Sequence, residues 1–288
     1  MANKKLKAPV NIPVSKIHPF EGNPYKVLDN DEMNNLICSI QEQGILTPII
    51  IRPIENTDEY EVISGHRRLH ATVKAGLETV PAFIYAITRD EAAIMLVDSN
   101  LHREHILPSE RAFAYKLKAE ALKHQGKRSD LTSVQVAPKL ATEQIGVTES
   151  ISKDTVKRYI RLTYLIPELL DLVDEEKIAL TPAVELSYLT DEEQYSLLGT
   201  IEEEDRTPSL SQAVRFKKLS QAGELSDESI ETIMQEDKAN QKPMFKVSME
   251  RLQKVAPKVK DKDFEDFVIK ACEHYYRYLQ RQRNRDAR

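Results

Sequence analysis

The stretch Ser64-Gly65-His66-Arg67-Arg68-Leu69-His70-Ala71 follows a predicted strand and opens a predicted helix that ends near Gly76. A glycine at such a junction lets the backbone approach a ligand closely. Free amides at the start of a helix attract anions, and two adjacent arginines add forked donors that suit phosphate. The stretch therefore predicts an anion site, above all for a polyphosphate. Paired arginines early in a helix are also common on solvated faces. This stretch alone therefore does not distinguish an anion site from an ordinary helix surface, and other parts of the chain are needed.

The composition describes a charge-rich globular protein. The chain has 288 residues, of which 41% are hydrophobic and 30% are charged, with eight glycines and no tryptophan. This length fits two domains and a short third module, and the scarcity of glycine favours helices. Cys38 and Cys272 lie far apart without metal-ligand spacing, which fits a reducing compartment. Because no apolar run has the length of a secretion signal or a membrane span, we expect a cytoplasmic protein.

The net charge of -5 hides three blocks of opposite sign. Residues 110–161 hold 11 basic and 6 acidic side chains, whereas residues 166–240 hold 6 basic and 19 acidic ones. Residues 275–288 then contain five arginines and one aspartate. Such a division is expected when one segment of a chain meets a polyanion.

The order of predicted elements divides the chain. Residues 1 to about 27 read as extended chain or loop, and a helix capped at Asp29 or Asn30 is expected to end at Gly44. Together with strands at 48–51, 59–63 and 80–87 and the arginine-bearing helix, these elements predict an α+β domain at 1–105. Helices alone follow, beginning with a long helix from Pro108 that stops at Gly126. We expect an all-α helix-turn-helix domain at 106–240 and a helical segment at 241–288.

Residues 139–165 read as helix, turn, helix. Gly146 is expected to end the first helix, which makes the turn longer than the shortest version of the motif, and Ser152 is expected to cap the second. One face of that second helix is apolar, and another carries cations at a spacing of four. Such a helix fits the major groove of DNA, although an ordinary surface helix has the same pattern. The predicted DNA-binding residues are Ser152, Lys153, Thr155, Lys157, Arg158 and Arg161.

Several short sequence motifs, called boxes below, resemble in kind and in order along the chain those of the bacterial chromosome and plasmid partition family that includes ParB, RepB and Spo0J. Asn23-Pro24 resembles the family's opening element, and Gly44-Ile45-Leu46-Thr47-Pro48-Ile49 resembles its Gly-x-x-Gln-Pro-Ile box. Gly65 to Ala71 resembles Gly-Glu-Arg-Arg-x-x-Ala, and Ser99-Asn100-Leu101-His102-Arg103 resembles Glu-Asn-x-x-Arg. The resemblance covers residues of about 17 to 190, and it is specific in combination rather than box by box.

The resemblance implies a pocket for CTP and Mg²⁺. Gly65, Arg67 and Arg68, with His66 between them, match the phosphate-binding box. Thr47 and Pro48 would approach the base or sugar, Asn100 would face the metal, and Arg103 would close the pocket. In this family the protein acts as a clamp that loads at a centromere-like DNA site, closes on CTP and slides along the duplex.

Two departures leave the chemistry open. His66 replaces the family's glutamate, and Ser99 replaces the acidic neighbour of Asn100. Mg²⁺ prefers hard oxygen ligands, and serine carries no charge. We therefore expect nucleotide binding with slow or absent CTP hydrolysis. The alternative is a DNA-binding adaptor or transcriptional regulator on the same fold. The similar fold of sulfiredoxins and small serine kinases raises enzyme chemistry too, but Gly65 stands where sulfiredoxins have their cysteine.

The resemblance also implies partners. Besides double-stranded DNA, we expect a ParA-type ATPase, engaged by the basic residues Lys4, Lys5 and Lys7. A C-terminal helix at about 263–283 is expected either to form a homodimer or to pack on its own chain, using an apolar face made of Phe264, Phe267, Val268, Ala271, Tyr275, Tyr278 and Leu279. We expect a location at the nucleoid or a plasmid, away from membranes.

Overall fold

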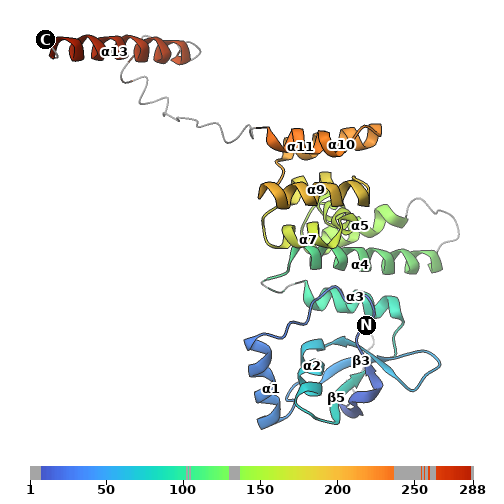
Figure 1. The fold of residues 1–288 in the computed structure, drawn as a ribbon. Coiled ribbons are helices and arrows are strands. Elements are labelled where there is room, and N and C mark those ends of the chain that lie inside the picture. The colour runs from blue at the N-terminus through green and yellow to red at the C-terminus, as the bar shows by residue number, and fades with distance from the viewer. Residues whose placement is uncertain are drawn as a thin grey trace. The chain divides into compact units, whose positions relative to one another are not determined.

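The computed structural model describes residues 8–101, 103, 105–129, 137–236, 254, 256, 259 and 264–286. The chain forms two compact units, Met1–Glu236 and Asp237–Arg288 (Figure 1). No helix within the described ranges has both the length and the apolar character that crossing a bilayer requires.

A five-stranded mixed sheet organises the first part of the chain, in the order β1-β5-β3-β4-β2. Strands β3 and β4 form an antiparallel pair, while β5 runs parallel to β3 and β2 runs parallel to β4. The strands are β1 Val10–Pro13, β2 Ile17–His18, β3 Ile49–Pro53, β4 Tyr60–Ser64 and β5 Thr79–Ile84. The three expected strands are confirmed, although the last ends at Ile84 rather than at 87, and the short edge strands β1 and β2 lie where only extended chain or loop was expected.

A buried ion pair reinforces the register of β3 and β4. Arg52 and Glu61 are directly opposite in the pairing, and the Arg52 Nε donates to Glu61 Oε2 at 2.8 Å. Both side chains are less than a tenth exposed. A slip by one residue would separate them and would also turn the buried side chains of Ile51 and Val62 toward the opposite face.

Two helices cover the candidate anion site. Helix α1, Asp31–Gln43, begins where the Asn30 side chain accepts a hydrogen bond from the Met33 amide, and it ends at Gly44. Helix α2, His66–Lys74, packs against it through a small cluster that contains Met33, Ile40 and Ala71. These boundaries confirm the expected cap and stop signals.

The turn from β4 into α2 requires glycine. Gly65 has φ of 101°, in the left-handed region that side chains rarely adopt. A Cβ built on it would lie 2.8 Å from Cγ2 of Ile49 in β3. The glycine therefore lets the start of α2 approach the sheet, whereas the sequence predicted an approach of the backbone to a ligand.

Helices form the rest of the first unit. Helix α3, Arg89–Asn100, starts at a capping box on Thr88 and packs on the long helix α4, Pro108–Ser129. The chain continues through α5 Ala137–Glu149, α6 Lys153–Arg161, η2 Leu162–Tyr164, α7 Pro167–Asp174, α8 Leu180–Leu186, α9 Asp191–Glu204, α10 Leu210–Ala222 and α11 Asp227–Gln235. The expected fold class, an α+β domain followed by helices, is confirmed.

In the second unit the described helix is α13, Phe264–Asp286. Its aromatic residues Phe267, Tyr275 and Tyr278 are 41%, 61% and 50% exposed. The expected C-terminal helix is present, and these three aromatic side chains are exposed.

Two glycines expected to end helices lie inside them. Helix α4 runs past Gly126 to Ser129, and α5 runs past Gly146 to Glu149. Glycine within a helix costs only about 1 kcal/mol relative to alanine, which the packing of these helices on their neighbours offsets. The turn between α5 and α6 is consequently short, from Ser150 to Ser152, so the expectation of a long turn was wrong.

Gly146 makes that short turn possible. A Cβ at this position would lie 2.8 Å from the backbone oxygen of Ile151 and 3.3 Å from the amide nitrogen of Lys153. Both neighbours are backbone atoms, so neither can rotate away. The glycine serves close packing of the turn rather than chain reversal.

We expect Gly146→Ala to lower the free energy of unfolding by about 1–3 kcal/mol, because the new methyl group overpacks against backbone. Gly199→Ala is the matched control, since Gly199 is also helical and a Cβ there meets no described atom within 4 Å. That control should gain up to about 1 kcal/mol from helix propensity. Urea unfolding of both variants measures the difference, and equal stabilities would contradict the packing argument.

Candidate functional site

The second arginine of the pair, Arg68, holds a loop. Its Nη1 donates to the backbone oxygens of Thr47 and Pro48, the latter at 2.8 Å. Burial lowers the pKa of the guanidinium. These bonds fasten the loop that leads into β3 onto the first turn of α2, so Arg68 acts between two parts of the protein.

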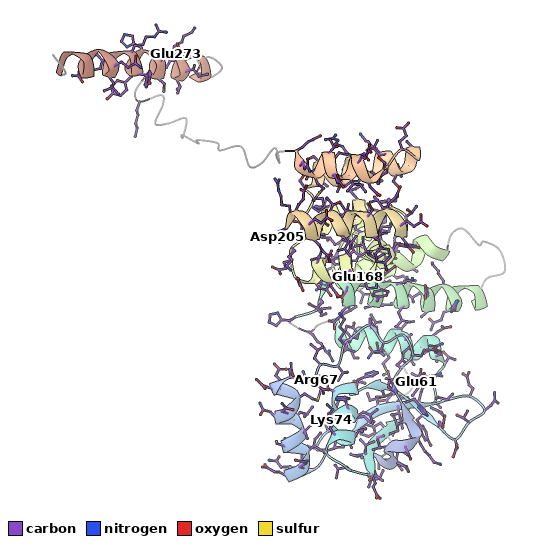
Figure 2. All side chains as sticks on the ribbon, in the orientation of Figure 1. Glu61, Arg67, Lys74, Glu168, Asp205 and Glu273 are labelled. Atoms are coloured by element: carbon purple, nitrogen blue, oxygen red, sulfur yellow. The ribbon has the colours of Figure 1, made fainter. Side chains whose placement is uncertain are left out.

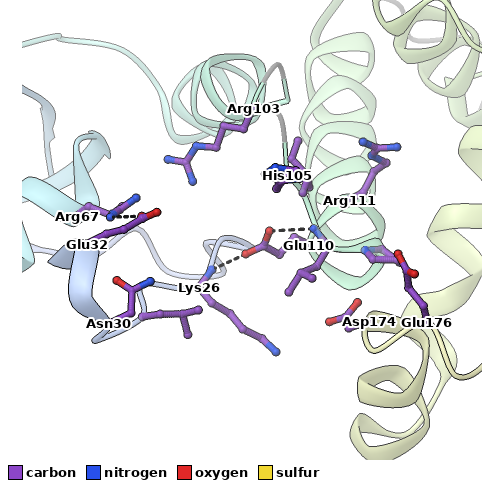
Figure 3. Close-up of a pocket in the computed structure, with 14 residues that line it drawn as sticks. Lys26, Asn30, Glu32, Arg67, Arg103, His105, Glu110, Arg111, Asp174 and Glu176 are labelled. Carbon is purple, nitrogen blue, oxygen red and sulfur yellow. Dashed lines mark hydrogen bonds and ion pairs between the residues drawn. The ribbon is translucent and has the colours of Figure 1, made fainter.

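The first arginine, Arg67, has a different environment. Its Nη2 lies 3.0 Å from Oε2 of Glu32 on α1, and its side chain is 42% exposed. Arg67 and Glu32 line a cavity of about 520 Å³ between the α1–α2 pair and the start of α4 (Figure 3). Of the two arginines, Arg67 is therefore the one that a ligand can reach from this cavity.

Arg103, in the segment between α3 and α4, also lines this cavity (Figure 3). Its guanidinium carbon is 5.5 Å from the centre of the Tyr25 ring, a cation–π contact. The Tyr25 hydroxyl donates to the backbone oxygen of Val97 at 3.4 Å, and burial raises its pKa. The Arg103 guanidinium is thus stacked on the uncharged ring of Tyr25.

Carboxylates occupy the start of α4, which forms the remaining wall. Asp174 Oδ1 accepts from the Ser109 amide at 2.9 Å, and Glu110 accepts from the amides of Lys26 and Leu107. The free amides at this helix start are therefore partly satisfied by the protein's own acids. An anion in the cavity would meet side-chain cations, among which are Lys26, Arg67, Arg103 and Arg111.

His66 cannot serve as a cation at neutral pH. Burial, together with the positive charge of the nearby Arg103, lowers the pKa of its imidazole to about 4. Its Nε2 is buried and finds no hydrogen-bond partner among the described residues. Of the two roles open to it, phosphate binding as a protonated ring or packing, neutrality favours packing.

The Ser99–Asn100 pair offers neutral oxygens and no carboxylate to a metal. Asn100 is buried, and its amide nitrogen donates to the Leu96 oxygen at 2.7 Å, while the Ser99 hydroxyl donates to the same oxygen. Within the described ranges no three His, Cys, Asp or Glu side chains come together as metal ligands. Since Mg²⁺ favours carboxylate oxygens, the pair lacks the ligand that this ion prefers, and the role of Asn100 at a metal stays a prediction.

The predicted nucleotide residues therefore fall into groups. Arg67 and Arg103 line the cavity, whereas Arg68 joins Thr47 and Pro48 beside Gly65. His66 and Asn100 do not line the cavity. Sequence reasoning missed Glu32, Lys26, Glu110 and Arg111, because the residues that face them lie tens of positions away.

The second candidate site is the helix-turn-helix formed by α5 and α6. Ser152 caps α6, because its Oγ accepts from the Thr155 amide at 3.1 Å. Lys153 and Lys157 are exposed, with Glu143 at 3.0 Å and Asp154 at 3.3 Å as their ion-pair partners. Exposed pairs of this kind contribute about 0–1 kcal/mol, so both lysines can exchange their partners for phosphate.

The two arginines of α6 bind it to α8. Arg158 donates to the Thr181 hydroxyl at 2.6 Å, and Arg161 donates to the hydroxyl and backbone oxygens of Ser187 at 3.0 and 2.7 Å. The Arg161 guanidinium also lies over the rings of Tyr164 and Tyr188, at 4.5 and 3.9 Å. The predicted basic stripe therefore consists of two exposed lysines and two arginines that hold the helix in place.

A family model and three similar relatives point to the same group of proteins. Residues 2–101 match the model of the ParB N-terminal domain. A nucleoid occlusion protein of Listeria innocua is 32% identical over 195 residues, covering 67% of this chain and 63% of that protein. The chromosome-partitioning protein Spo0J of Thermus thermophilus is 31% identical over 206 residues, covering 72% and 70%. A nucleoid occlusion protein of Geobacillus thermodenitrificans is 31% identical, covering 74% and 70%.

Solved structures give weaker likenesses. The C-terminally truncated ParB of Caulobacter crescentus, complexed to the centromeric parS site, has a TM-score of 0.40 at 21% identity, covering 78% of this chain and 98% of that one. Among the relatives compared by sequence, the match spans less than two thirds of the length of the Listeria protein and 70% of the length of the other two.

We expect the His66 imidazole to titrate with a midpoint near pH 4, and NMR signals of the ring measure this midpoint. Because the unfolded chain takes up this proton near pH 6.5, the unfolded state binds more protons between the two values. The free energy of unfolding should therefore fall as the pH drops from about 6.5 to about 4, and His66→Gln should lack this part of the slope. A midpoint near 6.5 in the folded protein would show that the ring is hydrated.

Proposed function

Because this chain belongs to the ParB family of partition and nucleoid occlusion proteins, we propose that it is a DNA-binding partition protein. It binds a centromere-like site on double-stranded DNA and acts as a CTP-gated sliding clamp. The observation that carries this proposal is the pairing, in one compact unit, of a helix-turn-helix with exposed lysines and a cavity with exposed arginines.

The helix-turn-helix supports the DNA part of the proposal. Helix α6 has an N-cap, a buried Val156 that faces the core and exposed Lys153 and Lys157. A recognition helix needs this division, because its N-terminal residues and its flanking cations meet the groove and the phosphates. Ser152, Thr155, Lys153 and Lys157 are the residues we assign to DNA. Arg158 and Arg161 hold α6 against α8 through their hydrogen bonds.

The cavity supports the nucleotide part. Arg67 and Arg103 supply forked donors from two different segments of the chain, which suits the several oxygens of a triphosphate. Arg68 supports this arrangement by fixing the loop of Thr47 and Pro48, next to which we place the base or sugar. Gly65 supports it by allowing α2 to start close to the sheet.

The alternative, a DNA-binding adaptor or regulator without CTP hydrolysis, has a specific observation in its favour. Ser99 stands where the family has an acidic residue, so the pair Ser99 and Asn100 offers no carboxylate to a metal. This version keeps the fold but has lost the nucleotide chemistry, so CTP affinity measured with and without Mg²⁺ separates it from the clamp.

The proposal extends to partners and location. The exposed aromatic face of α13 suits a homodimer, and a ParA-type ATPase would be met by Lys4, Lys5 and Lys7, which lie outside the described residues. Such a protein would work at the nucleoid or on a plasmid.

We expect Lys157→Ala to weaken binding to double-stranded DNA. The slope of log K against log salt should fall by about one unit, because one lysine no longer neutralises a phosphate. The melting temperature of the variant should not change. Lys177→Ala is the control, because Lys177 is a similarly exposed lysine with its own acidic partner, Glu175. Fluorescence anisotropy at several salt concentrations gives the slopes.

Arg161→Ala should behave differently in the same assay. Its guanidinium bonds and ring contacts hold α6, so the variant should lose about 1–3 kcal/mol of unfolding free energy and bind DNA more weakly for that reason. An unchanged salt slope in Lys157→Ala would show that α6 is not the DNA-reading helix.

We expect Arg67→Ala to weaken CTP binding about tenfold or more, because the variant cannot make a charge-assisted hydrogen bond to phosphate from this position. Lys74→Ala is closely matched, since both residues lie on α2 (Figure 2), both are 42% exposed and both pair with an acid near the start of α1. The control should bind CTP as the wild type does. Calorimetry measures both affinities, and equal losses would place the nucleotide elsewhere.

A further inference from the structure

Two acidic residues near the start of α1 reach α2. Asp29 accepts hydrogen bonds from His70 at 2.8 Å and from Lys74 at 2.6 Å. Glu32 pairs with Arg67 at 3.0 Å. Both acids thus pair with basic side chains of α2, but only one of these contacts lies at the cavity. Arg67 and Glu32 line the cavity, whereas Lys74 and His70 do not.

Glu32 and a phosphate would use the same donors. A carboxylate and a phosphate both bind guanidinium through its forked N–H groups. Figure 3 shows the Glu32 carboxylate at the end of the Arg67 side chain, at the edge of the open space. A phosphate that binds Arg67 from the cavity therefore meets a carboxylate already in position.

Glu32 can leave without moving its helix. Its side chain is 73% exposed, so it has water to turn into. Helix α1 stays attached to α2 through Asp29 and through the packing of Met33 and Ile40 with Ala71. The exchange is thus confined to one side chain.

We propose that Glu32 is an internal competitor for the phosphates of the bound nucleotide, and that it determines affinity and selectivity at this cavity. The proposal rests on the proposed nucleotide binding. Glu32 keeps Arg67 paired while the cavity is empty, and it remains a nearby negative charge when a ligand is bound. The repulsion grows with the charge of the ligand, so Glu32 weakens binding of a triphosphate more than that of a monophosphate.

The experiment compares Glu32→Gln with Asp29→Asn by calorimetry on the full chain, with CMP, CDP and CTP as ligands. Glutamine keeps the size of the side chain and removes its charge. We expect Glu32→Gln to bind CTP about three- to tenfold tighter at low salt, CDP less so and CMP nearly as the wild type does. The gain should shrink at high salt because screening weakens the repulsion. Asp29→Asn removes the other α1 carboxylate and should leave all three affinities unchanged.

The outcomes separate the inference from its premise. If the wild type binds CTP and Glu32→Gln binds it equally or more weakly, Glu32 is not a competitor. A gain of equal size for all three nucleotides would overturn the charge-based selectivity, and an equal gain in Asp29→Asn would point to the general field of α1. A wild type that binds none of the three nucleotides overturns the proposed function itself, and this inference with it. Melting temperatures of both variants show that the helices are intact.

Discussion

The close approach of α2 to the sheet is the constraint on which the first site depends. Gly65 has no Cβ, and one would lie 2.8 Å from Ile49. This approach brings Arg68 within reach of the Thr47 and Pro48 oxygens, which it fastens to α2. With Arg68 held, the neighbouring Arg67 is left to face Glu32 and the cavity. One left-handed glycine thereby gives two adjacent arginines different roles.

The same division of roles recurs in the helix-turn-helix. Arg158 and Arg161 bind α6 to α8, while Lys153 and Lys157 carry exposed charges with weakly held partners. Arginine suits the structural role because its planar group makes several hydrogen bonds at once and stacks on rings. Lysine carries a compact, mobile point charge, and such a charge can also contact phosphate. A cluster of cations in the sequence therefore overstates how many of them face the ligand.

The elements that the sequence predicted correctly are those set by local chemistry. The caps at Asn30 and Ser152 depend on residues three positions away, and the helix end at Gly44 depends on its own backbone. Gly126 and Gly146 were misjudged because a glycine can also stay inside a helix, where Gly146 allows the close approach of Ile151 and Lys153. The partners of Arg158 and Arg161 lie 23 and 26 residues further along, and Glu32 is 35 residues from Arg67. Such contacts depend on the fold, and no local pattern in the sequence indicates them.

A crystal structure of the full chain grown with CTP tests the central claim most directly. We expect phosphate oxygens on the Arg67 guanidinium with Arg103 beside the same ligand, Arg68 still bonded to the Thr47 and Pro48 oxygens, and the Glu32 carboxylate turned into solvent. A nucleotide bound away from Arg67, or an Arg68 side chain that leaves those oxygens to bind phosphate, would contradict the account.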